Sequence, residues 1–251
     1  MVFFFGFCTY NESKRLKGKR MLLLSEFLCL LASLIGPVIA VFVYCIMVPK
    51  GWKWILFGAV CYVITEMMIR LPLLTLLNSD ASIGPYLSAN PYLYAALMAA
   101  TAALLGIGSR WLVVRFILGW DDTNKIALGF GLGFGAIEAA LVSGIDWLLI
   151  VFSNPQPAVL GASPLTPLWS GMERLSILLF QIVWTILIFK SIRDKKPSLF
   201  WICLTANFLV VFGATCAVSI WNMPVWILEV ILLVPALWFG YSIAYKSIKS
   251  E

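Results

Sequence analysis

The 251-residue chain contains no histidine and has few charged residues. Without histidine it lacks the commonest metal ligand and the commonest acid–base group at neutral pH, which excludes Ser-His-Asp and Cys-His catalytic arrangements. Only 12% of the residues are charged and 62% are hydrophobic, whereas a soluble domain carries about twice that share of charge. The composition therefore predicts an all-α, polytopic membrane protein.

Motifs for soluble-protein chemistry are also missing. The six cysteines show no Cys-x-x-Cys spacing, and we interpret them as small buried hydrophobic residues rather than a disulfide or zinc framework. No phosphate-binding loop or nucleic-acid-binding module is present. The net charge of +6 is typical of cytoplasmic loops in a membrane protein. We expect membrane lipid around the chain, and no metal, cofactor or nucleic-acid partner.

Seven apolar stretches are long enough to cross a bilayer as helices. The expected spans are 22–47, 54–77, 92–118, 127–152, 172–190, 199–219 and 225–245. Lysine and arginine occur in the first, third and fifth loops and in the C-terminal tail, and the other loops have none. The positive-inside rule then predicts a bacterial cytoplasmic membrane protein with a cytoplasmic C-terminus and an outward N-terminus. The proline-containing connection 153–171 is expected to be an ordered extracytoplasmic loop.

Residues 1–20 do not fit the predicted outward position of the N-terminus, because they contain five lysine and arginine side chains. Two interpretations remain open. Either Met21 is the true initiator and residues 1–20 are not translated, or these residues form a basic tail with a membrane-associated segment at 1–10. Residues 21–251 are expected to form a single transmembrane domain.

The stretch 126–152 is rich in glycine and is expected to lie at the centre of the bundle. Successive helical residues turn by about 100°, so Gly129 and Gly133 lie on one side and Gly131 and Gly135 roughly opposite. Small residues at this spacing let neighbouring backbones approach closely. The pattern predicts a helix packed between partners on two sides.

Glu138 continues the face of Gly131 and Gly135, so we expect it to project toward protein rather than lipid. A charge inside a membrane is costly and by default indicates a functional site. The alternative is that Glu138 is protonated, or hydrogen-bonded to a neighbouring helix, and only holds the bundle together.

Other intramembrane ionisable groups are expected to have structural roles: Glu66, Arg70, Asp146, Glu173 and Arg174. Glu66 and Arg70 stand four residues apart, which predicts a self-neutralising pair facing the bundle interior. Arg110, in the third span, is a candidate partner for Glu138 or Asp146.

Four segments occur in a fixed order along the chain: Arg70-Leu-Pro-Leu-Leu74, Ala102-Ala-Leu-Leu-Gly-Ile-Gly-Ser-Arg110, Gly131-Leu-Gly-Phe-Gly-Ala-Ile-Glu-Ala139 and Glu173-Arg-Leu. Together they resemble the YhfC family of bacterial intramembrane metalloproteases, in the group that includes the CAAX-processing and PrsW-type proteases. The resemblance runs from about Met21 to the C-terminus and implies a CAAX-protease-like core of about seven transmembrane helices.

The resemblance also implies a metal site, built from a Glu-Glu pair in the third span and histidines in the three spans that follow. At the matching positions this chain has Gly106, Ile107, Phe134, Gln181 and Asn207. The family's arginine and fourth-span glutamate are retained as Arg110 and Glu138. Glutamine and asparagine form hydrogen bonds but hold zinc poorly. We therefore expect a pseudoprotease that keeps the scaffold without its metal ligands.

Three functions remain open at this point. A non-catalytic member would bind a transmembrane peptide or a partner membrane protein in the former active-site cavity. A metal-independent peptidase would use Glu138 as a base, with Asn207 or Gln181 steadying an oxyanion. The intramembrane charges also fit a small-solute transporter or an immunity-type membrane protein.

Overall fold

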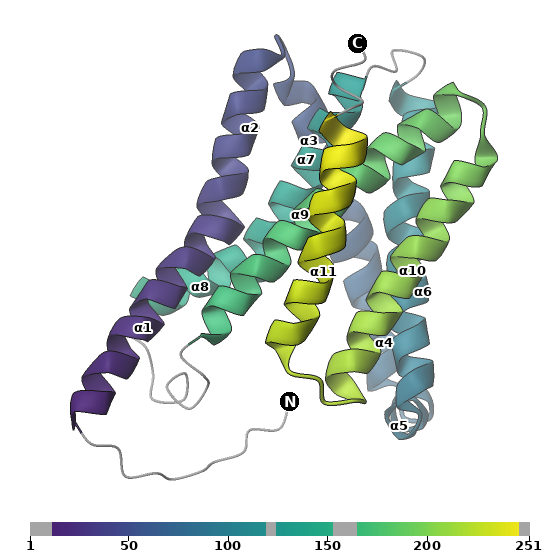
Figure 1. Cartoon of the computed structure of the whole chain (residues 1–251). Coiled ribbons are helices and arrows are strands. Elements are labelled where there is room, and N and C mark those ends of the chain that lie inside the picture. Colours follow the sequence, from purple (N-terminus) through teal and green to yellow (C-terminus); the bar gives the residue numbers. More distant parts are fainter. Residues whose placement is uncertain (1–11, 119–123, 153–164, 246–251) are drawn as a thin grey trace.

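The computed structural model describes residues 12–118, 124–152 and 165–245. Within these ranges all regular structure is helical and there is no strand. Seven of the described helices are long and apolar enough to cross a membrane, which confirms the predicted all-α architecture (Figure 1). Their bounds are Met21–Met47, Trp52–Ser79, Pro91–Ile117, Asn124–Leu149, Thr166–Arg193, Pro197–Ser219 and Val225–Ser242.

Several of these spans join an α-helix to a π-helical segment, here denoted η. In chain order the elements are α1 (Glu12–Leu30), η1 (Leu31–Ile35), α2 (Gly36–Met47), α3 (Trp52–Tyr62), η2 (Val63–Arg70), α4 (Leu71–Ser79), α5 (Ile83–Ala89), α6 (Pro91–Val113), η3 (Val114–Leu118), α7 (Asn124–Ala139), η4 (Ala140–Gly144), α8 (Ile145–Phe152), α9 (Thr166–Arg193), α10 (Pro197–Ser219), α11 (Val225–Phe239) and η6 (Gly240–Tyr245).

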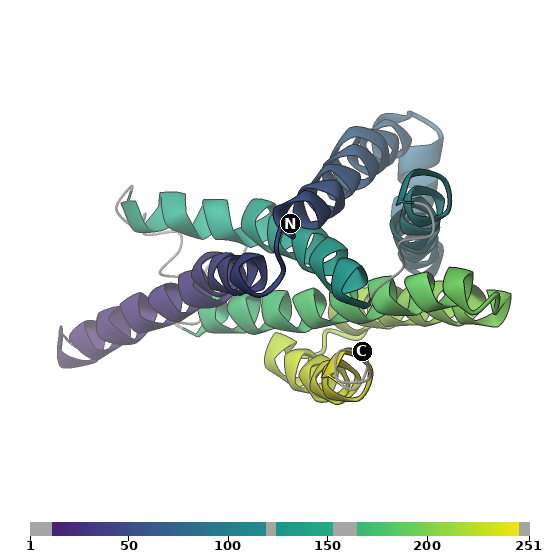
Figure 2. The same cartoon turned by 90° about the horizontal axis from the view of Figure 1, so that it is seen from above.

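Helices α7 and α9 form the centre of the bundle. In the most apolar part of α9, 61% of the residues are buried, against 11% in α10. Helix α7 packs between α3 and α9, while α10 packs against α6 and α9 (Figures 1 and 2). Most of the surface of α10 therefore faces away from the protein interior.

The glycines of α7 allow its backbone to touch helices on two sides. Gly129 and Gly133 face α2 and α3, and Gly131 and Gly135 face α9. A Cβ atom on Gly133 would lie only 2.1 Å from the carbonyl oxygen of Ile55. Side chains at these positions would separate the helices, so the central position of α7 depends on glycine.

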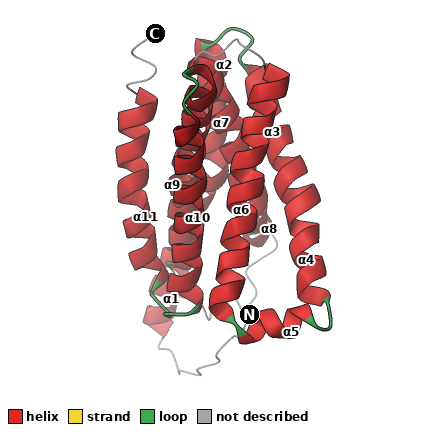
Figure 3. Ribbon diagram, turned by 90° about the vertical axis from the view of Figure 1, so that its right-hand side faces the viewer, coloured by secondary structure: helices red, strands yellow, loops and turns green. Residues whose placement is uncertain are grey.

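Two connections differ from the sequence-based expectation. The expected loop 78–91 contains the short helix α5, which lies between α4 and α6 at one end of the bundle (Figure 3). The expected loop 153–171 ends earlier, because α9 already begins at Thr166 and takes Pro167 into its first turn. Proline is tolerated there, since the N–H groups of a first helical turn have no intrahelical partner. Residues 153–164 lie outside the described part of the chain.

The N-terminal region continues directly into the first span. Helix α1 begins at Glu12, so residues 12–20 belong to the same helix as the membrane-spanning residues that follow. The predicted membrane-associated segment 1–10 lies outside the described residues.

Candidate functional site

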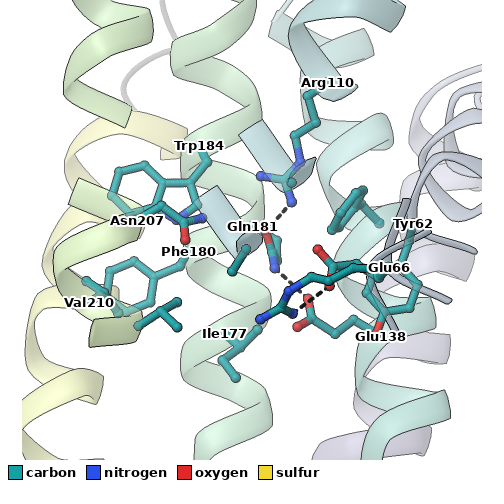
Figure 4. A pocket seen from close by; sticks show the side chains of 15 residues that line it. Tyr62, Glu66, Arg110, Glu138, Ile177, Phe180, Gln181, Trp184, Asn207 and Val210 are labelled. Carbon is teal, nitrogen blue, oxygen red and sulfur yellow. Dashed lines mark hydrogen bonds and ion pairs between the residues drawn. The ribbon is translucent and has the colours of Figure 1, made fainter. Parts of the chain in front are cut away.

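A cavity of about 160 Å³ lies between η2, α6, α7, α9 and α10 (Figure 4). Its ionisable and amide-bearing lining residues are Glu66, Arg70, Arg110, Glu138, Gln181 and Asn207. Aromatic side chains complete much of the wall, namely Tyr62, Phe134, Phe180 and Trp184.

The cavity lies near the middle of the membrane-spanning helices that line it. Five lining residues from five different spans each lie within about two residues of the midpoint of their span: Glu66, Gly106, Glu138, Gln181 and Asn207. At this depth polar groups cost most in a bilayer and are expected to face a partner or a cavity.

Gln181 bridges the two charged groups on either side of it. The Arg110 Nη2 group donates to Oε1 of Gln181, and the Gln181 Nε2 group donates to Oε2 of Glu138. Arg110 was predicted to pair with Glu138 or Asp146, whereas in the structure Gln181 lies between Arg110 and Glu138. Glutamine takes the intermediate place because its amide accepts from the cation and donates to the carboxylate at the same time.

Arg110 is held in the protein interior with only 1% of its surface exposed. Its guanidinium carbon lies 3.8 Å from the centre of the Phe134 ring, in a cation–π contact. Among the described residues, its Nε and Nη1 atoms have no hydrogen-bond partner. A buried cation in this state depends on the Gln181 bridge and on the more distant attraction of Glu138.

Glu66 and Arg70 form an ion pair of 2.7 Å between carboxylate and guanidinium. Arg70 also donates to Oγ1 of Thr101 at 3.2 Å and to the carbonyl oxygen of Met98 at 3.0 Å. The pair thus ties η2 to α6. Because both side chains also line the cavity, they are part of the site as well as of the scaffold.

Asn207 enters the cavity from α10, on the wall that faces Gln181 (Figure 4). Within the described ranges its side-chain amide makes no hydrogen bond. An unpaired amide inside a membrane-spanning helix has both a donor and an acceptor left for another molecule.

The predicted site residues Ile107 and Asp146 lie away from the cavity. Ile107 is fully buried but is not a lining residue, because it is rotated by about 100° from Gly106 on α6. Asp146 is exposed on α8 and lies outside the cavity, so it is not the partner of Arg110.

Further buried charges lie near the start of α9. Arg174 donates from Nη2 to Glu173, and its positive charge attracts the carboxylate of Glu138. Glu229 on α11 is 2% exposed and interacts electrostatically with Glu173 and Arg174. Sequence reasoning missed Glu26 on α1, which is 1% exposed. A single acid inside the long apolar run of the first span was the available signal.

Comparison with known protein families identifies a match. The family model described as YhfC intramembrane metalloprotease matches residues 34–232. A search of the curated proteins found no match, and a search of the solved structures found none either.

The family description implies a metal ion, which the cavity residues do not fit. The described residues contain no group of three His, Cys, Asp or Glu side chains that could hold one. The carboxylate of Glu66 is already paired with Arg70. The guanidinium groups of Arg70 and Arg110 both line the cavity, and their charge would repel a divalent cation.

Proposed function

We propose, since this chain belongs to the YhfC intramembrane metalloprotease family, that it is a non-catalytic member which binds a transmembrane peptide or partner membrane protein in its cavity. One observation carries the proposal. The positions at which the family resemblance implies metal ligands include Gly106, Phe134, Gln181 and Asn207, and all four line the same cavity. None of these side chains is a good zinc ligand.

The polar lining of the cavity supports a binding role. Asn207 has an unpaired amide, and Glu138 accepts a hydrogen bond through only one of its two oxygens within the described residues. Such groups are costly in a membrane unless a partner satisfies them. A ligand that reaches the cavity from the bilayer would gain these hydrogen bonds.

The orientation in the membrane is part of the same proposal. Outside α1, lysine and arginine gather at one end of the bundle, in the connection after α2, at the start of α7 and at the end of α9, whereas the basic residues at the start of α1 lie toward the opposite end (Figure 1). This supports a cytoplasmic position for that end and for the C-terminus of a bacterial cytoplasmic membrane protein.

Filling the cavity from one glycine provides the test. A Cβ atom at Gly106 would lie 3.6 Å from Oε1 of Glu66, so the side chain of Gly106→Leu would extend into the cavity. Gly108 lies two residues along the same helix, and a Cβ there would meet nothing within 4 Å. Gly108→Leu is therefore the matched control.

The readout is photo-crosslinking in membranes of the expressing cell, from a small diazirine amino acid in place of Val210, which lines the cavity. We expect a crosslinked product of defined mass that disappears with Gly106→Leu and persists with Gly108→Leu. The same product in both variants would show that the cavity is not the binding site.

A metal-independent peptidase is the second candidate, because Glu66 and Glu138 present two carboxylates to the same cavity. Glu138 would then be the general base that activates a water molecule. Cleavage of a transmembrane reporter by the purified chain in the presence of a chelator, lost in Glu138→Gln, would favour this candidate over the binding protein.

A further inference from the structure

The size of the cavity limits what it can hold. Its volume of about 160 Å³ is close to that of an engineered protein cavity of about 150 Å³ that accommodates benzene. Three residues of extended peptide would already be about 10 Å long and would bring their own side chains. The cavity therefore has room for one side chain rather than for a peptide segment.

The formal charges of the ionisable side chains that line the cavity cancel. The carboxylates of Glu66 and Glu138 are matched by the guanidinium groups of Arg70 and Arg110. A ligand with a net charge would leave one charge uncompensated at mid-membrane depth, where desolvation is expensive. Neutral polar groups carry no such penalty.

Asn207 and Glu138 offer groups for hydrogen bonding from different walls of the cavity, on α10 and α7. Asn207 has no partner within the described ranges, and the Oε1 atom of Glu138 accepts no hydrogen bond there. A ligand that satisfies both needs an N–H donor for the carboxylate and an acceptor for the Asn207 amide. A carboxamide carries both in one small planar group.

From this size, neutrality and hydrogen-bonding pattern, we infer that the cavity receives the side-chain amide of a glutamine or asparagine in the middle of a partner's transmembrane helix. The inference rests on the proposed function and names the chemical group that the cavity recognises. The central depth of the cavity places the amide near the midpoint of the partner helix.

Synthetic transmembrane helices test the inference with the full chain in liposomes. The probes are leucine–alanine peptides of about 20 residues, flanked by lysine, with Gln, Leu, Glu or Lys at the central position. Binding is measured by energy transfer between labelled protein and labelled peptide. We expect the Gln peptide to bind about tenfold more tightly than the Leu peptide, since it gains two hydrogen bonds. The Glu and Lys peptides should bind no more tightly than the Leu peptide.

A matched pair of variants on α10 assigns the preference to the cavity. Asn207→Leu should abolish the preference for Gln, while Thr205→Leu should retain it because Thr205 is exposed on the same helix. Equal binding of the Gln and Leu peptides, or tighter binding of the Glu or Lys peptide, would overturn the inference. If either result is found but peptide binding is still lost in Gly106→Leu and kept in Gly108→Leu, the inference fails and the proposed function stands. If no peptide shows binding that Gly106→Leu removes, both fail.

Discussion

Replacing Gly133 with alanine should destabilise the bundle, although alanine is the better helix former. The added Cβ atom would lie 2.1 Å from the carbonyl oxygen of Ile55 and 2.7 Å from its carbonyl carbon. A backbone oxygen cannot rotate away as a side chain can. Helix α3 would have to move by about 1 Å to restore a normal contact, which would loosen its packing against α7.

The expected loss can be worked out from two opposing terms. Overpacking against a fixed neighbour costs about 1–3 kcal/mol, and contact with backbone favours the upper end of that range. Alanine gains about 1 kcal/mol over glycine in a helix interior. The net result for Gly133→Ala is a loss of about 2 kcal/mol. Gly108→Ala meets no neighbour within 4 Å and should gain up to about 1 kcal/mol.

Reversible unfolding in mixed detergent micelles, followed by circular dichroism, measures both variants against the unsubstituted chain. Opposite signs for Gly133→Ala and Gly108→Ala are the expected result. If Gly133→Ala is as stable as the unsubstituted chain, the close α3–α7 contact does not exist in the form described. Equal destabilisation by both variants would show that the effect is not specific to this contact.

Two further predictions follow from charged groups. Arg70→Met should lower the free energy of unfolding in the same assay by about 3 kcal/mol, because Glu66 is left without its cation. Adding Glu66→Gln to this variant should recover much of the lost stability. If it recovers none, the ion pair is contradicted. The backbone N–H groups of Ile83 and Ser82 hold the pKa of the exposed Asp80 below its ordinary value of 3.8. Its contribution to α5 is therefore complete above about pH 4 and is lost as the pH falls through the lower folded-state pKa. Hydrogen-exchange protection of α5 should decline over that range, and Asp80→Asn should remove the pH dependence.

The spans could be predicted from sequence because a bilayer constrains them strongly. A helix that crosses it needs about 20 apolar residues, and only helices satisfy every backbone group within one segment. The predicted start of α9 was wrong. Pro167 suggested a loop in the sequence, but proline is tolerated in the first turn of a helix. Helix α5 was missed because its seven residues are too few to show a helical period and include a glycine and a proline, which are typical of loops.

The site was predictable in its residue types but not in its connections. Arg110, Phe134, Glu138, Gln181 and Asn207 were all named from sequence, and the structure places them on one cavity. That Gln181 stands between Arg110 and Glu138 depends on how α6, α7 and α9 approach each other. Spacing within one helix determines which residues share a face, but it does not determine which faces meet.

The glycine faces of α7 also bear on how the carboxylate of Glu138 is located. Most buried groups are positioned by the rotamers of surrounding side chains, which can readjust after a substitution. Glu138 is instead carried by a helix whose main chain rests against main chain on α3 and α9. The position of Glu138 therefore depends on how closely the backbone of α7 approaches the backbones of α3 and α9. A single methyl group added to one of the α7 glycines would change that position.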